Sequence, residues 1–274
     1  LAAAVRNPFY PLLPKTSLAG NNTTRAQLLR PYPHFTSISY DHNQAYSWYH
    51  SLQTRFEKRF TQNYTMSLSW TWSKFMEATK YLNETDPVSA KVISDQDRTH
   101  RIVVTGLWEL PFGRGKRWGA SANPVLSRII GGWQAQGIFQ GQSGPAIGFG
   151  NAIFTGSLAN VPLPKGQRTI ERWFNVDAGF EKDSRKQLGS NIRTLSSRFS
   201  GIRGDGMNHW DLSIIKNTEI TETVRLQFRA EFINAFNHTQ FAAPNTSPSS
   251  TAFGTVTADT QWPRAIQLGL KLLY

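Results

Sequence analysis

A strict alternation of apolar and polar residues is the feature that most constrains how this chain can fold. It is clearest in residues 64–73, where one parity holds only Tyr64, Met66, Leu68, Trp70 and Trp72 and the other holds only serine and threonine. Successive side chains of a strand point to opposite faces, so a period of two predicts a strand with one apolar face. No helical repeat fits this segment.

Seven segments share the alternation and are predicted to be strands, namely residues 48–58, 63–76, 99–110, 132–142, 208–217, 223–236 and 264–274. They are about twice as long as strands of soluble proteins, which cluster near 5–6 residues. A tilted strand needs about 9–11 residues to cross a bilayer. We therefore expect an all-β fold, an antiparallel transmembrane β-barrel segment of about seven long strands.

The connections between these segments differ in length in a regular way. Those near residues 59–62 and 218–222 are tight and 111–132 is intermediate, whereas 77–97, 145–206 and 237–262 are long. In an antiparallel sheet all the long connections fall on one side, which is typical of the extracellular loops of outer-membrane barrels. Residues 1–274 are expected to form the C-terminal portion of a single barrel domain, and the sequence is expected to be part of a longer protein.

The charged residues of the predicted strands favour a membrane over a sandwich core. An arginine or lysine at the bilayer midplane costs about 2–4 kcal/mol. The apolar parity carries cations only near strand ends, at Lys58, Lys74 and Lys216, where long side chains can reach water. We expect the opposite parity to face a lumen, with these polar candidates: Arg55, Glu57, Gln134, Gln136, Arg225, Arg229 and Glu231.

Large aromatic residues of the apolar parity gather near both ends of the predicted strands. With residue 274 on the periplasmic side, Trp48, Trp72 and Trp210 lie at outer ends, and Tyr64, Trp108, Trp133 and Tyr274 at inner ends. Two belts of aromatic rings mark the two interfaces of a membrane. The alternative is a soluble β-sandwich module for adhesion or carbohydrate binding, whose aromatics would be scattered through a core.

The last strand carries a possible assembly signal. Its spacing of polar, glycine, apolar and aromatic residues resembles the β-signal read by the barrel-assembly machinery, and is carried by Gln267, Gly269, Leu272 and Tyr274. The alternative is an ordinary amphipathic strand.

Four separated blocks also resemble one transporter family. The runs DQDRTHRIVVTGLWELPFGRGKRWG, GGWQAQGIFQGQSGP, AEFINAFNHTQFAAPNT and RAIQLGLKLLY are similar to TonB-dependent transporters of the Oar-like group, and the likeness covers roughly residues 28–274. It implies a large barrel in the bacterial outer membrane, plugged by an N-terminal domain that this sequence does not contain. It also implies uptake of a bulky substrate energised through the TonB complex. A passive porin-type barrel is the alternative within membrane proteins.

Composition excludes several other classes. There is no cysteine, the six histidines show no metal-ligand spacing, and no G-x-S-x-G motif is present, so we expect neither a catalytic residue, nor a metal site, nor a cofactor. The glycine-rich stretch 113–119 lacks the spacing of a phosphate-binding loop. The net charge of +12 is divided between the predicted lumen and the loops, so lipid and lipopolysaccharide are the expected partners, and nucleic acid is not.

Overall fold

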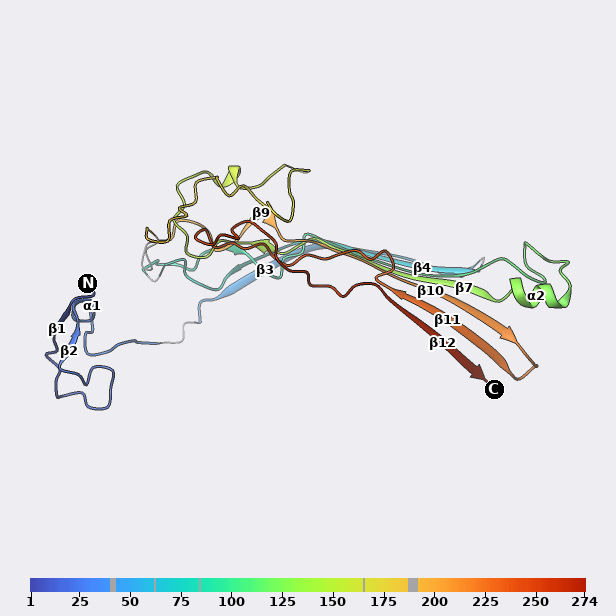
Figure 1. The fold of residues 1–274 in the computed structure, drawn as a ribbon, viewed down its shortest axis with the longest axis horizontal. Coiled ribbons are helices and arrows are strands. Elements are labelled where there is room, and N and C mark those ends of the chain that lie inside the picture. Colours follow the sequence, from blue (N-terminus) through green and yellow to red (C-terminus); the bar gives the residue numbers. More distant parts are fainter. Residues whose placement is uncertain (40–42, 62, 84, 165, 187–191) are drawn as a thin grey trace. The chain divides into compact units, whose positions relative to one another are not determined.

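Seven long strands form one antiparallel sheet in the computed structural model of the chain. They are β3 (Tyr46–Thr61), β4 (Tyr64–Ala78), β6 (His100–Glu109), β7 (Trp133–Gln142), β10 (Met207–Glu219), β11 (Arg225–Ile233) and β12 (Ala265–Leu273). The structure describes residues 1–39, 43–61, 63–83, 85–164, 166–186 and 192–274. Each long strand pairs with the next one along the chain, giving an up-and-down meander (Figure 1). The prediction of about seven long antiparallel strands is confirmed.

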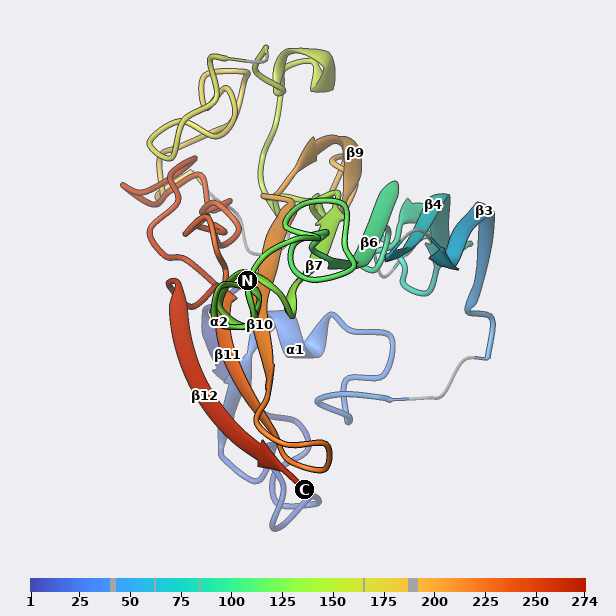
Figure 2. The ribbon, with the colours of Figure 1, turned by 90° about the vertical axis from the view of Figure 1, so that its right-hand side faces the viewer.

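The sheet is curved but open (Figure 2). Within the described ranges, β3 pairs only with β4 and β12 pairs only with β11, so the sheet has two free edges. Each free edge presents a row of backbone N–H and C=O groups without a ladder partner.

All seven predicted strands agree with the observed ones to within three residues at either end, and the sixth was predicted three residues too long at its C-terminal end. The prediction placed it at residues 223–236, whereas β11 ends at Ile233. Asn234 adopts a positive φ of 50°, and its side chain exchanges hydrogen bonds with the backbone of His238. A left-handed residue of this kind ends the ladder. Gln62, in a predicted tight turn, lies outside the described residues.

The register joins the separate alternations into two continuous faces. On one face Leu68 pairs with Val104, Val104 with Phe139, and Phe139 with Trp210. One position along, Ser69 pairs with Val103, Val103 with Gln140, and Gln140 with His209, on the opposite face. Directly paired residues point to the same side of a sheet. One face is therefore apolar across all seven strands, and the other is largely polar.

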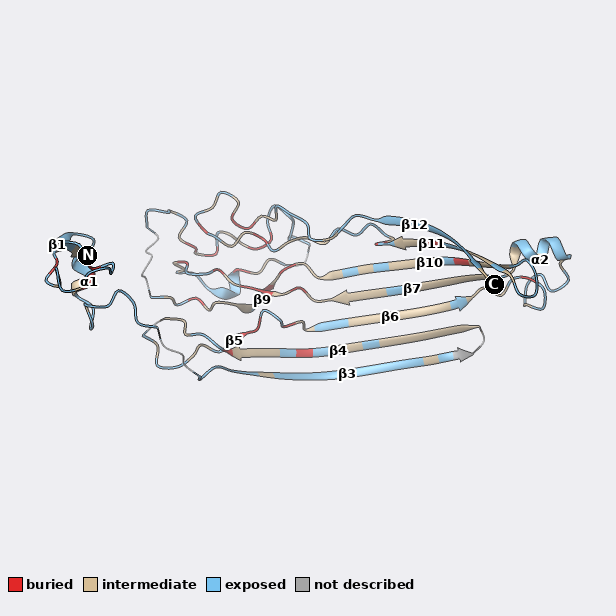
Figure 3. Ribbon diagram, turned by 90° about the horizontal axis from the view of Figure 1, so that it is seen from below, coloured by how far each residue is buried: buried red, intermediate tan, exposed pale blue. Residues whose placement is uncertain are grey.

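The long connections all lie at one end of the strands, as the sequence predicts (Figure 3). They contain β5 (Val92–Ile93), β8 (Ala146–Ile147), the 3₁₀ helix η1 (Leu158–Asn160) and β9 (Phe199–Arg203). The connection between β6 and β7 lies at the other end and contains α2 (Pro124–Ile130), which Asn123 caps by accepting a hydrogen bond from Leu126 N at 2.8 Å.

The main cluster of buried apolar residues lies in the long connections. Phe149, Phe174, Phe180 and Phe253 meet with ring centroids 4.5–6.4 Å apart. The backbone of the β7–β10 connection also bonds that of the β11–β12 connection, where Trp173 N donates to Gly254 O at 2.8 Å. These two connections therefore form one packed cluster, called the loop core below.

Residues Leu1–Gln44 form a separate compact unit. It contains β1 (Ala4–Arg6), antiparallel to β2 (Asn22–Thr24), and the single-turn helix α1 (Arg25–Leu28). The buried side chain of Asn7 donates to Leu18 O and Gly20 O at 2.6 and 2.8 Å and so fastens its connecting loop. The assignment of all 274 residues to one barrel domain stays a prediction.

Candidate functional site

The polar face of the sheet carries every residue predicted to face a lumen. Arg55 and Glu57 lie on β3, Gln134 and Gln136 on β7, and Arg225, Arg229 and Glu231 on β11. The register places them on one side, but four strands lie between β3 and β11, so these residues do not converge on one site. The lining of a lumen by these residues stays a prediction.

Ion pairs balance much of the charge on this face. Arg55 pairs with Glu57 at 3.2 Å, and Arg229 pairs with Glu231 at 3.3 Å, each two residues apart on the same side of one strand. Across strands, Gln134 Nε2 donates to Glu109 Oε1 at 3.3 Å. Exposed pairs of this type contribute about 0–1 kcal/mol each, so their main effect is to keep the face wet and charged.

The apolar face is bare. Leu270 is 70 % exposed, Leu268 is 67 % exposed and Phe228 is 36 % exposed, and no second layer of the described chain covers them. A soluble sandwich would bury this face under a second sheet. Large contiguous apolar surfaces of this kind mark contact with a membrane or with another protein.

The predicted interface aromatics lie near the two ends of this apolar face. Trp48 stacks on Tyr46, Trp72 stacks on His100, and Trp210 packs against Phe139 with centroids 4.4 Å apart, all toward the end that carries the long connections. The other end carries Tyr64 paired with Trp108, Trp133 at the start of β7, and Tyr274 just after β12. Their contact with the membrane interface stays a prediction.

The residues of the β-signal pattern lie on or beside the free-edge strand β12. Gln267 pairs with Glu231 and Gly269 with Arg229 on the polar face, while Leu272 pairs with Leu226 on the apolar face. A Cβ added at Gly269 would meet no atom within 4 Å. Packing within the described chain therefore does not require glycine at this position, which leaves recognition during assembly as the predicted reason for it.

A change at Tyr274 tests this signal. We expect Tyr274→Ala in the full-length protein to lower several-fold the fraction that folds in the outer membrane, because the assembly machinery loses its aromatic contact. Heat-dependent mobility on gels measures the folded fraction. Leu270→Ala, on the same face of β12 but outside the pattern, is the control, and an equal loss in both variants would count against the signal.

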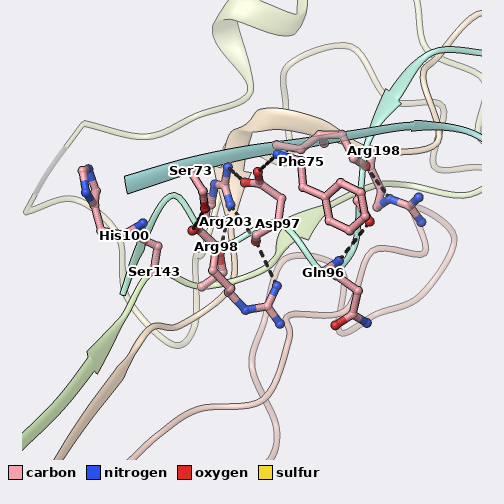
Figure 4. A network of polar contacts seen from close by, with 12 residues as sticks. Ser73, Phe75, Gln96, Asp97, Arg98, His100, Ser143, Arg198 and Arg203 are labelled. Carbon is pink, nitrogen blue, oxygen red and sulfur yellow. Dashed lines mark hydrogen bonds and ion pairs between the residues drawn. The ribbon is translucent and has the colours of Figure 1, made fainter. Parts of the chain in front are cut away.

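A buried polar network joins the strand ends to the long connections (Figure 4). Asp97 is 0 % exposed, and its two carboxylate oxygens accept hydrogen bonds from Phe75 N at 2.6 Å and from Arg203 Nη2 at 2.7 Å. Arg203 also donates to Gly144 O at 3.2 Å. A buried charge persists only when its lone pairs are satisfied. Asp97 therefore ties β4, β9 and the end of β7 together.

A second pair reinforces the same junction. Arg198 pairs with Glu77 at the end of β4 and donates to Ile93 O at 2.9 Å, as Figure 4 shows in part. Sequence reasoning missed this network. Asp97 lies in the first of the four blocks that resemble the transporter family, which was the available signal. Its cationic partner Arg203 follows 106 residues later, and no spacing rule links the two.

The surface of the β7–β10 connection carries exposed charge pairs with lowered carboxylate pKa values. A hydrogen bond and the positive charge of Lys182, whose Nζ lies 2.6 Å away, lower the pKa of Asp177. The Arg185 guanidinium lowers the pKa of Asp183, and the backbone N–H of Asp183 lowers that of Glu181. These carboxylates therefore stay ionised at pH values at which an ordinary carboxylate becomes protonated. The loop surface keeps both its negative and its positive side chains charged in mild acid.

Among the described residues, no three His, Asp or Glu side chains gather as a metal site would require. His42 lies outside the described residues. None of the described helices has the length and apolar character needed to span a membrane. The absence of catalytic residues and of a metal site stays a prediction.

Comparison with known proteins gives one match. The sequence model of the family described as "Outer membrane beta barrel domain" matches residues 4–267. Searches of curated proteins and of solved structures found nothing that matches this chain. The family match extends over nearly the whole chain and accords with the length, pairing and two-faced character of the strands.

Proposed function

The chain belongs to the outer membrane beta barrel domain family, and we propose that its strands form part of a larger barrel that imports a bulky substrate, driven through TonB. The family places the protein in the outer membrane. The proposal of import is supported by the free sheet edges, by the polar face and by the sequence blocks that resemble TonB-dependent transporters of the Oar-like group.

The open sheet is the observation that carries the proposal. A bilayer core offers no hydrogen-bond partner to backbone groups, so membrane strands must close into a barrel. The described seven-stranded sheet has free edges at β3 and β12, and further strands are needed to pair with them. A barrel substantially wider than eight strands encloses room for a channel or a plug.

The polar face suits the inside of such a barrel. Many of its charges are paired with each other, as along a lumen that contacts a plug domain or a passing solute. We propose that an N-terminal plug of the same protein packs on this face, and that the aromatic ends contact membrane lipid and lipopolysaccharide. Catalysis and nucleic-acid binding form no part of the proposal.

Conductance and TonB binding separate this proposal from a passive porin. The full-length protein, purified in detergent, is inserted into planar bilayers, and the purified periplasmic domain of TonB is tested for binding to it. A plugged transporter is expected to show no steady ion current and to bind TonB. A steady current together with no TonB binding would establish the porin instead and overturn the proposal.

A further inference from the structure

A groove of about 1020 Å³ lies on the apolar face, at the end of the sheet away from the loop core. Tyr64 and Met66 of β4, Trp108 of β6 and Leu212 of β10 line it. All four side chains belong to the apolar parity. The groove therefore opens on the apolar face, which is predicted to contact hydrocarbon, and not on the polar face.

Small residues form the middle of the groove. Gly106 and Gly137 pair directly across β6 and β7, and Ala135 lies beside Trp108 one apolar position further along. Three adjacent positions of the face thus carry a methyl group or less, while Met66 and Leu212 stand on both sides. The volume of this groove is at the upper end of the roughly 300–1,000 Å³ of small-molecule sites.

A cation stands at the rim of the groove. Arg117 comes from the β6–β7 connection and lines the groove, with its guanidinium carbon 5.5 Å from the ring centre of Trp118. Trp118 is held in turn by a hydrogen bond from its N–H to Pro111 O at 3.0 Å and by the ring of Phe112. Within the described part of the chain, Arg117 has no carboxylate partner.

A second cation lies beside the same wall. Lys58 of β3 pairs with Met66, and its ammonium lies 4.1 Å from the ring centre of Tyr64, so it is held over a wall residue of the groove. The ion pairs of the described residues leave this lysine without a carboxylate too. An apolar groove flanked by two cations without acidic partners complements a molecule with a long apolar chain and an anionic head.

We propose that this groove binds one anionic glycerophospholipid of the membrane, with an acyl chain over Gly106 and Gly137 and the phosphate beside Arg117. The groove lies at the end of the short connections, which is the periplasmic side of outer-membrane barrels. Tyr64 and Trp108, which are predicted to lie at the membrane interface, line the groove together with Trp118. The site is thus distinct from loose lipid contact along the rest of the face, and it does not depend on whether the barrel transports.

Native mass spectrometry of the full-length protein tests the proposal. After delipidation in detergent, the protein is titrated with phosphatidylglycerol and, separately, with phosphatidylethanolamine of the same acyl chains. We expect one phosphatidylglycerol to bind several-fold more tightly than phosphatidylethanolamine. Arg117→Ala is expected to weaken phosphatidylglycerol about tenfold, as for the loss of one charge-assisted hydrogen bond.

A variant that fills the groove tests whether the acyl chain of the lipid lies in it. A Cβ at Gly106 would meet only Thr65 O at 3.7 Å, an ordinary contact, so Gly106→Leu fills the groove without straining the backbone. We expect this variant to lose the tight site for both lipids. Thr54→Leu, an exposed position of the same face outside the groove, and Arg114→Ala, in the same connection as Arg117, are the matched controls.

Heat-dependent gel mobility checks first that each variant is folded. Equal lipid binding by the wild type and Gly106→Leu would overturn the proposal. So would equal weakening by Arg117→Ala and Arg114→Ala, or occupation of the groove by detergent alone.

Discussion

Replacing Val104 by arginine is expected to destabilise the folded protein by about 2–4 kcal/mol, the cost of a cation near the middle of a membrane-facing strand. Val104 lies near the centre of β6, between Leu68 and Phe139 on the apolar face. Arginine at this depth cannot reach water without deforming the bilayer or its own strand. The free energy of unfolding of the full-length protein in phospholipid vesicles, measured by urea titration, gives the cost.

The neighbouring valine provides the control. Val103 lies on the same strand at the same depth but between Ser69 and Gln140 on the polar face. Val103→Arg places its charge among polar groups and is expected to change the free energy of unfolding by no more than about 0.5–1 kcal/mol. If the two variants lost equal stability, or if Val103→Arg lost more, the assignment of the apolar face to lipid would be wrong.

Replacing Asp97 by alanine is expected to release the long connections from the strand ends. The change leaves the largely buried Arg203 without its carboxylate partner and Phe75 N without its acceptor. Breaking a buried ion pair by removing one partner costs about 3–5 kcal/mol, which exceeds the effect of any exposed pair on the polar face. The loss should be local, because the strand ladders of β4 and β6 remain intact.

Hydrogen exchange locates this effect. The amides of Phe75 and β9 are expected to exchange much faster in Asp97→Ala, while those of β10 and β11 keep their protection. Asp95→Ala removes an exposed carboxylate two residues away and should change neither region. Unchanged protection of β9 in Asp97→Ala would show that the ion pair does not hold the connection in place.

The strands were predictable because the information for them is local. The alternation in residues 64–73 fixes which side chains share a face, and its length indicates a bilayer before any pairing is known. The same local rule placed the end of β11 three residues too late, because Asn234 turns the chain directly after Ile233. The hydrogen bonds between the Asn234 side chain and the backbone of His238 determine where the strand ends, and no periodic sequence pattern predicts them.

The loop core was not predictable for a related reason. Phe149, Phe174, Phe180 and Phe253 lie in segments rich in glycine, proline, asparagine and serine, without a repeat that assigns a face to each ring. Irregular backbone brings such residues together through contacts between distant segments. The Asp97–Arg203 pair is similar, because the two residues are separated by 106 positions.

The sequence by itself therefore determined the strands, their two faces and the side on which the long connections lie, since each follows from a period of two and from segment length. Only the tertiary structure decided the register between neighbouring strands, and this register forms the groove over Gly106 and Gly137. It also decided the loop core and the buried ion pair. The physical reason is that alternation fixes a side chain's direction within its own strand, whereas register and long-range packing depend on which distant residues can satisfy each other's hydrogen bonds and fill each other's volume.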